Sequence, residues 1–268
     1  MDRRLRQALI APLRAVGLLP AAFRWYERLS ARRAAGASDA RTDDGLALPP
    51  PLLRYRVAGS TDSAWFIECG AAVFDLIEQQ LAERGVKLSD LGDVLDFGCG
   101  CGRVLRHWRI VTGPRIHGSD YSAELVAWCD ANLRFAQVSV NSGDPPLAHV
   151  ESTFDLVYAI SVFTHLSVER QTRWLDELWR VLKSGGYLLL TLHAASFRDQ
   201  LDERERAAFD AGELVVRYRE ASGTNLCGVY HPDAFVRGAW TRAFEVCALV
   251  PAGTRANVLQ DVYLLRKI

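Results

Sequence analysis

The stretch VLDFGCGCGRVLRHW, residues 94–108, places three glycines at alternate positions directly after a short apolar run. The apolar run predicts a β-strand, and the residues after the glycines are compatible with a helix. Glycines at such a junction let the backbone turn tightly and approach a ligand closely. Because ligands bind at the carboxyl ends of strands in open α/β sheets, the stretch predicts a ligand-binding turn.

Strands and helices alternate on both sides of this turn. The expected strands are residues 93–98, 115–120, 136–141, 154–161 and 187–193, and the expected helices are residues 64–85, 103–111, 122–133 and 168–186. Residues 244–268 predict a strand, a long turn and a second strand. This order predicts an α/β fold with a doubly wound Rossmann-like sheet, mostly parallel, with a C-terminal antiparallel hairpin and helices on both faces.

The chain has 268 residues, with 32 basic and 32 acidic side chains, and this balance offers no general attraction to nucleic acid or membranes. No apolar run is long enough for a membrane span. We expect a basic N-terminal helical extension and linker over residues 1–50 and one domain over residues 51–268. Within that domain, the charged, helix-prone residues 197–230 break the alternation and predict an insertion or lid.

The first 35 residues contain eight arginines but only two acids, Asp2 and Glu27. A basic amphipathic segment of this kind can lie on a membrane surface or a partner protein. Pro12 and Pro20 interrupt it, which favours a solvated, partly ordered helix instead. The sequence leaves the oligomeric state open.

Six cysteines are scattered along the chain, and only Cys99 and Cys101 lie close together. No second cluster completes a tetrahedral metal site, so we expect no metal and interpret both as small residues tolerated in a tight loop. The spacing favours a reduced, cytoplasmic protein over a disulfide framework.

Asp96 stands at the end of the strand, beside the glycine turn. A carboxylate there would repel the pyrophosphate of a dinucleotide, and it favours a cationic ligand instead. The glycine spacing is GxGxG, whereas the dinucleotide fingerprint is GxGxxG. A nicotinamide-dependent oxidoreductase is therefore disfavoured.

The segment VLDFGCGCGR resembles motif I of the class I S-adenosylmethionine-dependent methyltransferases, and the resemblance extends over about residues 90–195. The resemblance implies that S-adenosyl-L-methionine is the cofactor. It places the following motif I residues at that cofactor: Asp96, Gly98, Cys99, Gly100 and Gly102. FDLVYAISVFTHL resembles motif IV, which adds Ile160 and Ser161 at the end of the fourth strand.

The resemblance assigns three further residues to parts of the cofactor. Asp120, 18 residues after Gly102, would accept hydrogen bonds from the ribose hydroxyls. Tyr121 would lie against the adenine, and Asp144 would accept a hydrogen bond from the adenine amino group. Two of these residues have structural alternatives, because Asp120 could cap the next helix and Asp144 precedes two prolines as a turn residue could.

Transfer of a methyl group to a hydroxyl needs a base to remove the proton, and histidine is the usual base near neutral pH. His165 follows the fourth strand and His193 follows the fifth, so both should border the cleft. We rank His165 first and His193 second, with a structural hydrogen bond as the alternative for each. Four residues that could form walls of the acceptor pocket are Tyr55, Arg56, Trp65 and Tyr230, and Asp261 could also face it.

These features predict a methyltransferase acting on a small-molecule acceptor, with a hydroxyl of a sugar or secondary metabolite as the favoured target. The C-terminal segment resembles a subset of these enzymes linked to sugar or polyketide tailoring. After the fourth strand, SVFT stands where many enzymes that methylate base or amide nitrogen carry NPPY, which disfavours that chemistry. The catalytic portion also lacks a stripe of basic residues with interleaved aromatics, so we expect no nucleic-acid partner. The alternative is a degenerate methyltransferase fold that serves as a binding or scaffold protein.

Overall fold

The computed structural model describes residues 44–240, 243–254 and 259–268, together with the isolated positions 18, 21, 22, 25, 29 and 42. Most of the basic segment in the first 35 residues lies outside these ranges, so its predicted helix stays a prediction. In the described part of the chain, no helix is long and apolar enough to cross a membrane.

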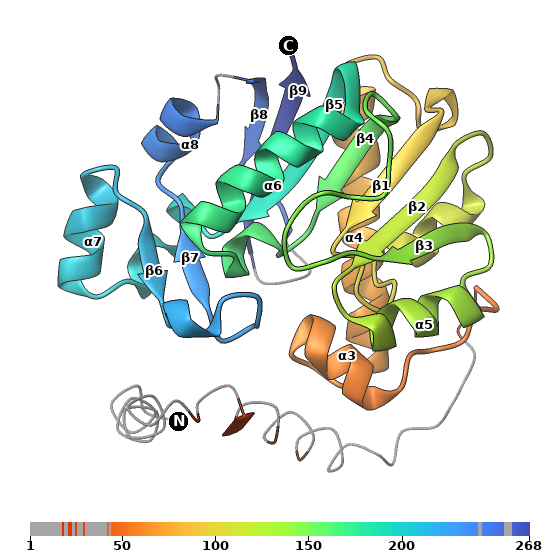
Figure 1. The fold of residues 1–268 in the computed structure, drawn as a ribbon, viewed down its shortest axis with the longest axis horizontal. Coiled ribbons are helices and arrows are strands. Elements are labelled where there is room, and N and C mark those ends of the chain that lie inside the picture. Colours follow the sequence, from red (N-terminus) through yellow and green to blue (C-terminus); the bar gives the residue numbers. More distant parts are fainter. Residues whose placement is uncertain are drawn as a thin grey trace.

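Seven strands form one sheet in the order β3-β2-β1-β4-β5-β9-β8 (Figure 1). Its strands are β1 (Asp93–Phe97), β2 (Arg115–Asp120), β3 (Ala136–Val140), β4 (Phe154–Ala159), β5 (Leu182–Leu192), β8 (Phe244–Val250) and β9 (Asp261–Lys267). The first five are parallel, while β9 runs antiparallel to both β5 and β8. This topology confirms the predicted fold class, and it reverses the strand order between β1 and β4.

Helices cover both faces of the sheet. On one face lie α4 (Ser63–Ala82) and α5 (Ala123–Asn132), and on the other α6 (Val168–Val181) and α8 (Asp233–Ala239). Helix α3 (Pro51–Ala58) packs against α4 and α5 instead. All five residues of β1 are buried, which explains its continuous apolar sequence. Val94 belongs to the core cluster shared with α4, whereas its neighbour Leu95 belongs to the cluster shared with α6. Alternate side chains of one strand therefore supply two cores.

Two helices differ from the sequence-based prediction. The segment after the glycine turn forms a 3₁₀-helix, η2 (Leu105–Ile110), and not the expected α-helix over residues 103–111. Leu105, Arg106 and Trp108 are all buried there, so packing on several sides outweighs the α-helical preference. Helix α6 ends at Val181, before the two glycines expected to terminate it, because Leu182 already pairs with Phe154 of β4.

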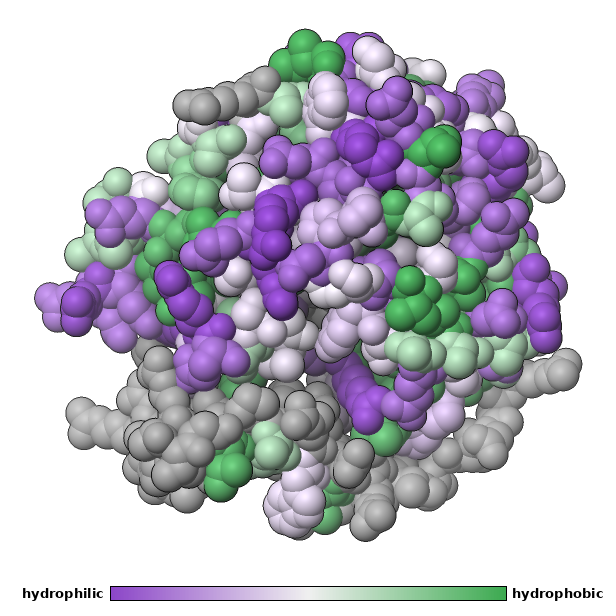
Figure 2. All heavy atoms as spheres, viewed as in Figure 1, coloured by the Kyte–Doolittle hydropathy of each residue, from purple (hydrophilic) through white to green (hydrophobic). Residues whose placement is uncertain are grey.

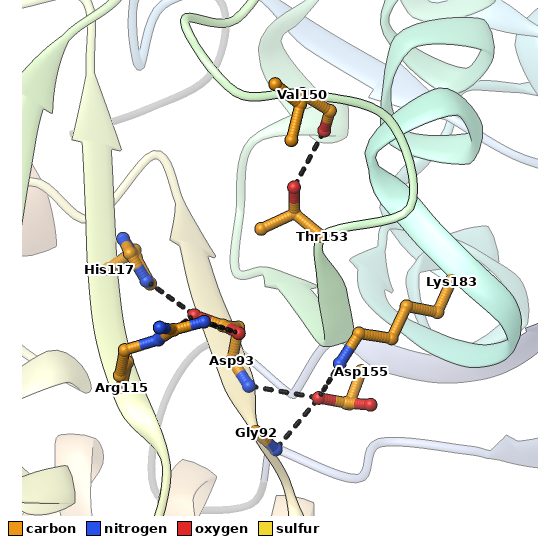
Figure 3. Close-up of polar contacts among 8 residues, drawn as sticks. All are labelled: Gly92, Asp93, Arg115, His117, Val150, Thr153, Asp155 and Lys183. Carbon is orange, nitrogen blue, oxygen red and sulfur yellow. Dashed lines mark hydrogen bonds and ion pairs between the residues drawn. The ribbon is translucent and has the colours of Figure 1, made fainter.

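The edge of the sheet opposite the glycine turn is held by two carboxylates (Figure 3). Asp155 Oδ2 accepts hydrogen bonds from the backbone nitrogens of Gly92 and Asp93, at 2.8 and 3.0 Å, and from Lys183 Nζ at 2.8 Å. The Asp93 carboxylate in turn accepts a bidentate pair of hydrogen bonds from Arg115. These contacts join the beginnings of β1, β2, β4 and β5, so they fix the register of the sheet.

The predicted insertion, residues 197–230, forms a small unit of its own at one end of the sheet (Figure 1). It contains helix α7 (Glu203–Asp210) and the antiparallel pair β6 (Val215–Arg217) and β7 (Gly228–Tyr230). Its core is a separate cluster of apolar residues from both α7 and the strand pair. A bridge between His193 and Tyr230 joins it to the end of β5.

Hydrophilic and hydrophobic side chains are mixed over the face of the molecule that Figure 2 shows. The large apolar side chains that are exposed come from separate elements, with Ile110 at the end of η2 and Val150 in the loop before β4 as examples. Scattered apolar residues of this kind are normal on a protein surface.

Candidate functional site

A cavity of about 530 Å³ lies at the carboxyl ends of β1, β2 and β4, where the strand order reverses. This is the position at which open α/β sheets bind ligands. The predicted site residues that line it are Asp96, Gly98, Cys99, Gly100, Asp120, Tyr121, Ile160, Ser161 and His165. Gly102, Asp144 and His193 do not line it.

The glycine turn is built as the sequence predicts. The backbone nitrogens of Gly98 and Cys99 both donate to the carbonyl of Ser119, at 2.8 and 3.0 Å, which joins the turn to β2. Gly98 has a φ of +79°, and a Cβ there would lie 2.4 Å from Cγ2 of Val162. A side chain at this position would therefore be both strained and obstructed.

Gly102 does not line the cavity and instead lies against Leu133. A Cβ at this position would lie 2.4 Å from Cδ1 of Leu133, at the end of α5. The absence of a side chain lets the turn approach α5, so this glycine acts on the site only by holding the turn in place.

Asp96 lies in the middle of the sheet, paired in register with Gly118 of β2 and Tyr158 of β4. Its side chain is 3% exposed. Burial, assisted by the nearby Asp120, raises the pKa of Asp96 to about 7, against the opposing influence of Tyr158 and Arg103. A carboxylate that is costly to ionise in the free chain gains most from a cation placed beside it.

Asp120 is bound to the backbone on both sides of the cavity. Its Oδ2 accepts from the nitrogen of Gly100 at 3.0 Å, and its Oδ1 accepts from the nitrogen of Ser122 at 2.8 Å. Burial raises the pKa of Asp120, although these two hydrogen bonds oppose that effect. Each carboxylate oxygen keeps capacity for a second donor, so a ligand hydroxyl fits here. The neighbouring Tyr121 side chain is exposed and borders the same cavity.

Asp144 is directed to arginines of α6. Its Oδ1 lies 2.9 Å from Arg173 and 3.5 Å from Arg170. The wall of the cavity at this point comes from Asn141, Ser142 and Gly143 instead. The Oδ1 atom of Asn141 is a buried acceptor with no donor in the described part of the chain. Asn141 was not predicted, although its position directly after the third strand could have signalled it.

Ser161 follows β4 with a φ of +60°, an unusual backbone conformation for a residue other than glycine. Its nitrogen donates to Thr191 Oγ1 at 2.7 Å, and its hydroxyl donates to Gln260 Oε1 at 2.8 Å. These contacts from β5 and from the residue before β9 hold the strained turn. Ile160 and Ser161 therefore face the cavity in a fixed arrangement.

His165 lies at the end of a short 3₁₀-helix, η3 (Phe163–His165), and lines the cavity. Its Nδ1 lies 2.6 Å from the carbonyl oxygen of Cys227. A carbonyl can only accept, so Nδ1 carries the proton and Nε2 is the unprotonated nitrogen. Burial lowers the pKa of His165, which keeps the ring neutral at physiological pH. The ring is therefore held in one orientation, with Nε2 able to accept a proton.

His193 is half-buried beside His165, with ring centroids 6.2 Å apart, but it does not line the cavity. Burial, and then the nearby His165 and His231, lower the pKa of His193 to about 3. Its Nε2 lies 3.2 Å from the amide nitrogen of Gln260, which donates to it. This arrangement favours the structural alternative for His193.

Residues 222–225 of the insertion form a strap over the cavity, which the sequence did not predict in this detail. The hydroxyl of Tyr121 donates to the carbonyl of Gly223 at 3.1 Å, and the nitrogen of Gly223 donates to the carbonyl of His165 at 2.7 Å. On the other side, Asn225 Nδ2 donates to the carbonyl of Arg56 in α3 at 2.6 Å. The strap thus connects three segments around the cavity.

Of the proposed acceptor-wall residues, only Arg56 lines the cavity. Tyr230 is buried in the core of the insertion. Asp261 accepts hydrogen bonds from the nitrogens of Ser196 and Ala252, at 2.9 and 2.7 Å, so it supports the loops and not the site. In the described residues, no group of three or more His, Cys, Asp or Glu side chains could hold a metal ion.

Residues 95–190 match the family of methyltransferase domains. A phosphoethanolamine N-methyltransferase of Plasmodium falciparum is 25% identical over 120 residues, which cover 44% of this chain and 45% of that protein. A tRNA (carboxymethyluridine(34)-5-O)-methyltransferase of Arabidopsis thaliana is 34% identical over 109 residues, 40% of this chain and 25% of that protein. The chain spans about half the length, or less, of these curated relatives.

The fold has matches among solved structures as well. An S-adenosylmethionine-dependent methyltransferase from Methanosarcina mazei superimposes with a TM-score of 0.54 at 20% identity, over 70% of this chain and 97% of that one. Residues 95–190 therefore carry a methyltransferase domain, and the fold is that of S-adenosylmethionine-dependent methyltransferases, whose cofactor is S-adenosylmethionine. The names of the two relatives specify different acceptors, phosphoethanolamine and a carboxymethyluridine of tRNA, so the similarity leaves the acceptor open.

Proposed function

We propose that this chain transfers a methyl group from S-adenosylmethionine to a hydroxyl of a small-molecule acceptor. The observation that carries the proposal is His165, whose Nε2 is free to accept a proton in the same cavity as the glycine turn. In the described residues, no protein donor is bonded to this nitrogen. A scaffold protein would have no need of an oriented base beside an intact cofactor turn.

The residues of the cavity fit the cofactor. S-adenosylmethionine, when bound, supplies an activated methyl group on a positively charged sulfur. Asp96 provides a buried carboxylate for the cationic end of this molecule, and Asp120 provides acceptors for the ribose hydroxyls. Asn141 lines the cavity and has an acceptor without a donor among the described residues, whereas Asp144 does not line the cavity and is ion-paired with Arg173, so Asn141 is the better candidate for a contact to the adenine.

His165 would take the proton from the acceptor hydroxyl at Nε2 as the oxygen becomes the nucleophile. The carbonyl of Cys227 holds the ring by Nδ1 and stabilises the imidazolium that results. Removal of water by the strap and correct placement of the acceptor supply the rest of the rate enhancement.

The strap is the reason to favour a small acceptor over a nucleic acid. Residues 222–225 cover the cavity and are bonded to Tyr121, His165 and Arg56. A tRNA base would need to be extruded and inserted beneath this cover. We assign residues 51–268 to the methyltransferase domain, with residues 197–230 as its lid and residues 1–50 as an extension.

The free thiols of the chain support a reducing compartment as its location. All six cysteines lack a disulfide partner, and five of them are buried. We therefore propose that the protein acts in the cytoplasm.

The test is a methyl-transfer assay with labelled cofactor against a panel of sugars, polyketides and phenols, with bulk tRNA in a separate reaction. We expect transfer to a hydroxyl compound, lost in His165→Ala while calorimetric affinity for the cofactor is retained. Transfer to tRNA alone would contradict the small-molecule assignment. Failure of the wild-type chain to bind the cofactor would contradict the enzyme assignment altogether.

A further inference from the structure

Arg170 lies near the beginning of α6 and brings a guanidinium to the wall of the cavity. In the described part of the chain its side chain donates no hydrogen bond, and its ion pair with Asp144 is long, at 3.5 Å from Nε to Oδ1. The side chain is 34% exposed, so it is only partly removed from water. A guanidinium has five N–H donors, and those of Arg170 are therefore available to a ligand.

Asp144 does not fully neutralise Arg170, because a second arginine of α6 shares it. Its Oδ1 lies 2.9 Å from Nη2 of Arg173, which is the shorter of the two contacts. Neither Asp144 nor Arg173 lines the cavity, so the closer pair lies outside it. One carboxylate thus serves two guanidinium groups, and these three side chains carry one positive charge in excess.

The two segments beside the guanidinium leave its end uncovered. A Cβ on Gly143 would lie 3.7 Å from Nη2 of Arg170, and a Cβ on Gly223, in the strap, would lie 3.8 Å from Nη1. Both neighbours are glycines, so no side chain from either position covers these nitrogens. The nitrogen of Gly223 also donates to the carbonyl of His165 at 2.7 Å. One strap residue therefore adjoins both the guanidinium and the segment that carries the base.

Two other arginines line the cavity, but neither offers a comparable opening. Nη1 of Arg56 is ion-paired with Oε2 of Glu124. Arg103 is 4% exposed and directly follows the glycine turn, where the donor is expected. Arg170 is thus the arginine of the cavity that is best placed to meet an acceptor under the strap.

We propose that the acceptor carries an oxyanion, a carboxylate or a phosphate, which Arg170 binds while the acceptor hydroxyl faces His165. This inference rests on the proposed transfer to a hydroxyl and narrows its substrate class. A guanidinium binds the oxygens of either group through parallel N–H donors, which a neutral sugar or phenol does not match. The acidic side chains that line the cavity, Asp96 and Asp120, are buried and are assigned to the donor. They therefore leave Arg170 to the acceptor.

The first measurement identifies the product. The full chain is incubated with methyl-labelled S-adenosylmethionine and a small-metabolite extract of the cells that the chain comes from, and the labelled product is determined by mass spectrometry and NMR. We expect a methoxy compound that carries a carboxylate or a phosphate, and phosphatase treatment distinguishes the two. A product with neither group would overturn the inference and leave the proposed methyl transfer intact. Absence of transfer to any compound would refute the proposed function and the inference together.

The second measurement is steady-state kinetics of Arg170→Met with that acceptor. KM for the acceptor should rise roughly 10-fold, the lower end of the range for a hydrogen bond to a charged group, because the guanidinium is partly exposed. The turnover number and the dissociation constant of the donor should change little, since the interaction is made equally in the ground state and the transition state. Arg170→Lys, which keeps the charge but not the paired donors, should give an intermediate KM.

Arg134→Met is the matched control, because Arg134 is exposed and does not line the cavity. It should keep the wild-type KM, and thermal unfolding of each variant checks that it is folded. An unchanged KM in folded Arg170→Met would overturn the inference even if the product is acidic. Weaker donor binding with an unchanged KM would overturn it as well, because Arg170 would then serve the donor.

Discussion

Replacing Asp96 by Asn should change how the stability of the ligand-free chain depends on pH. In the unfolded chain an aspartate ionises with a pKa near its ordinary value of 3.8, whereas in the folded chain the pKa of Asp96 is about 7. Between these values the folded state holds a proton that the unfolded state has released. Stability must therefore fall as the pH rises through this window.

The size of the effect follows from the two pKa values. Each pKa unit corresponds to about 1.4 kcal/mol, so integration from pH 5 to pH 8 gives a loss of roughly 2–3 kcal/mol from this one side chain. Asn keeps the shape of the side chain but cannot ionise. The Asp96→Asn chain should lack this loss and should be relatively more stable at pH 8, although it binds the cationic cofactor more weakly.

The measurement is urea unfolding of both chains at pH 5 and pH 8 without cofactor. For each chain it gives the change in the free energy of unfolding between the two pH values, and these two changes are compared. Histidines with lowered pKa values, such as His165 and His193, have opposite pH dependence but contribute equally to both chains and cancel. Asp130→Asn, an exposed change on α5, is the control and should behave like the wild type. If the free energy of unfolding changes equally between pH 5 and pH 8 in the wild type and in Asp96→Asn, the reasoning is refuted.

Three further predictions concern the base, the turn and the sheet. His165→Ala should reduce turnover on a hydroxyl acceptor by about 10²- to 10⁴-fold with an unchanged cofactor dissociation constant, and unchanged turnover would remove His165 from the base role. Gly98→Ala should lower stability by about 1–3 kcal/mol and weaken cofactor binding, because its Cβ meets Val162 at 2.4 Å; a wild-type melting profile with full binding would contradict this. Lys183→Met should cost only about 1 kcal/mol in urea unfolding, because its ion pair with Asp155 is partly exposed, and a loss several times larger would show that this estimate is wrong.

Much of the fold could be predicted because its strands are buried on both faces. The continuous apolar sequences of β1 and β4 leave little alternative to a central parallel sheet. The site residues at or near the carboxyl ends of the parallel strands could also be predicted, since these ends meet along one side of the sheet. Asp96, Asp120 and Ser161 line the cavity for this reason.

The remaining features depend on contacts between distant segments, which local patterns do not encode. Asp144 has the expected position in the chain, but two arginines of α6 draw its side chain aside. The strap lies about 100 residues beyond Tyr121 in the sequence, and no sequence pattern predicts the contact between them. The η2 segment has an α-helical sequence pattern, and only the crowding around Trp108 explains its tighter winding.

The left-handed turn at Ser161 has a consequence for engineering of β9. Its hydroxyl donates to Gln260, which directly precedes β9, and Gln260 also contacts His193. A substitution that displaces Gln260 would release this turn nearly a hundred residues upstream. Changes at the beginning of β9 would then alter donor binding, although two strands, β4 and β5, separate β9 from β1 and its glycine turn.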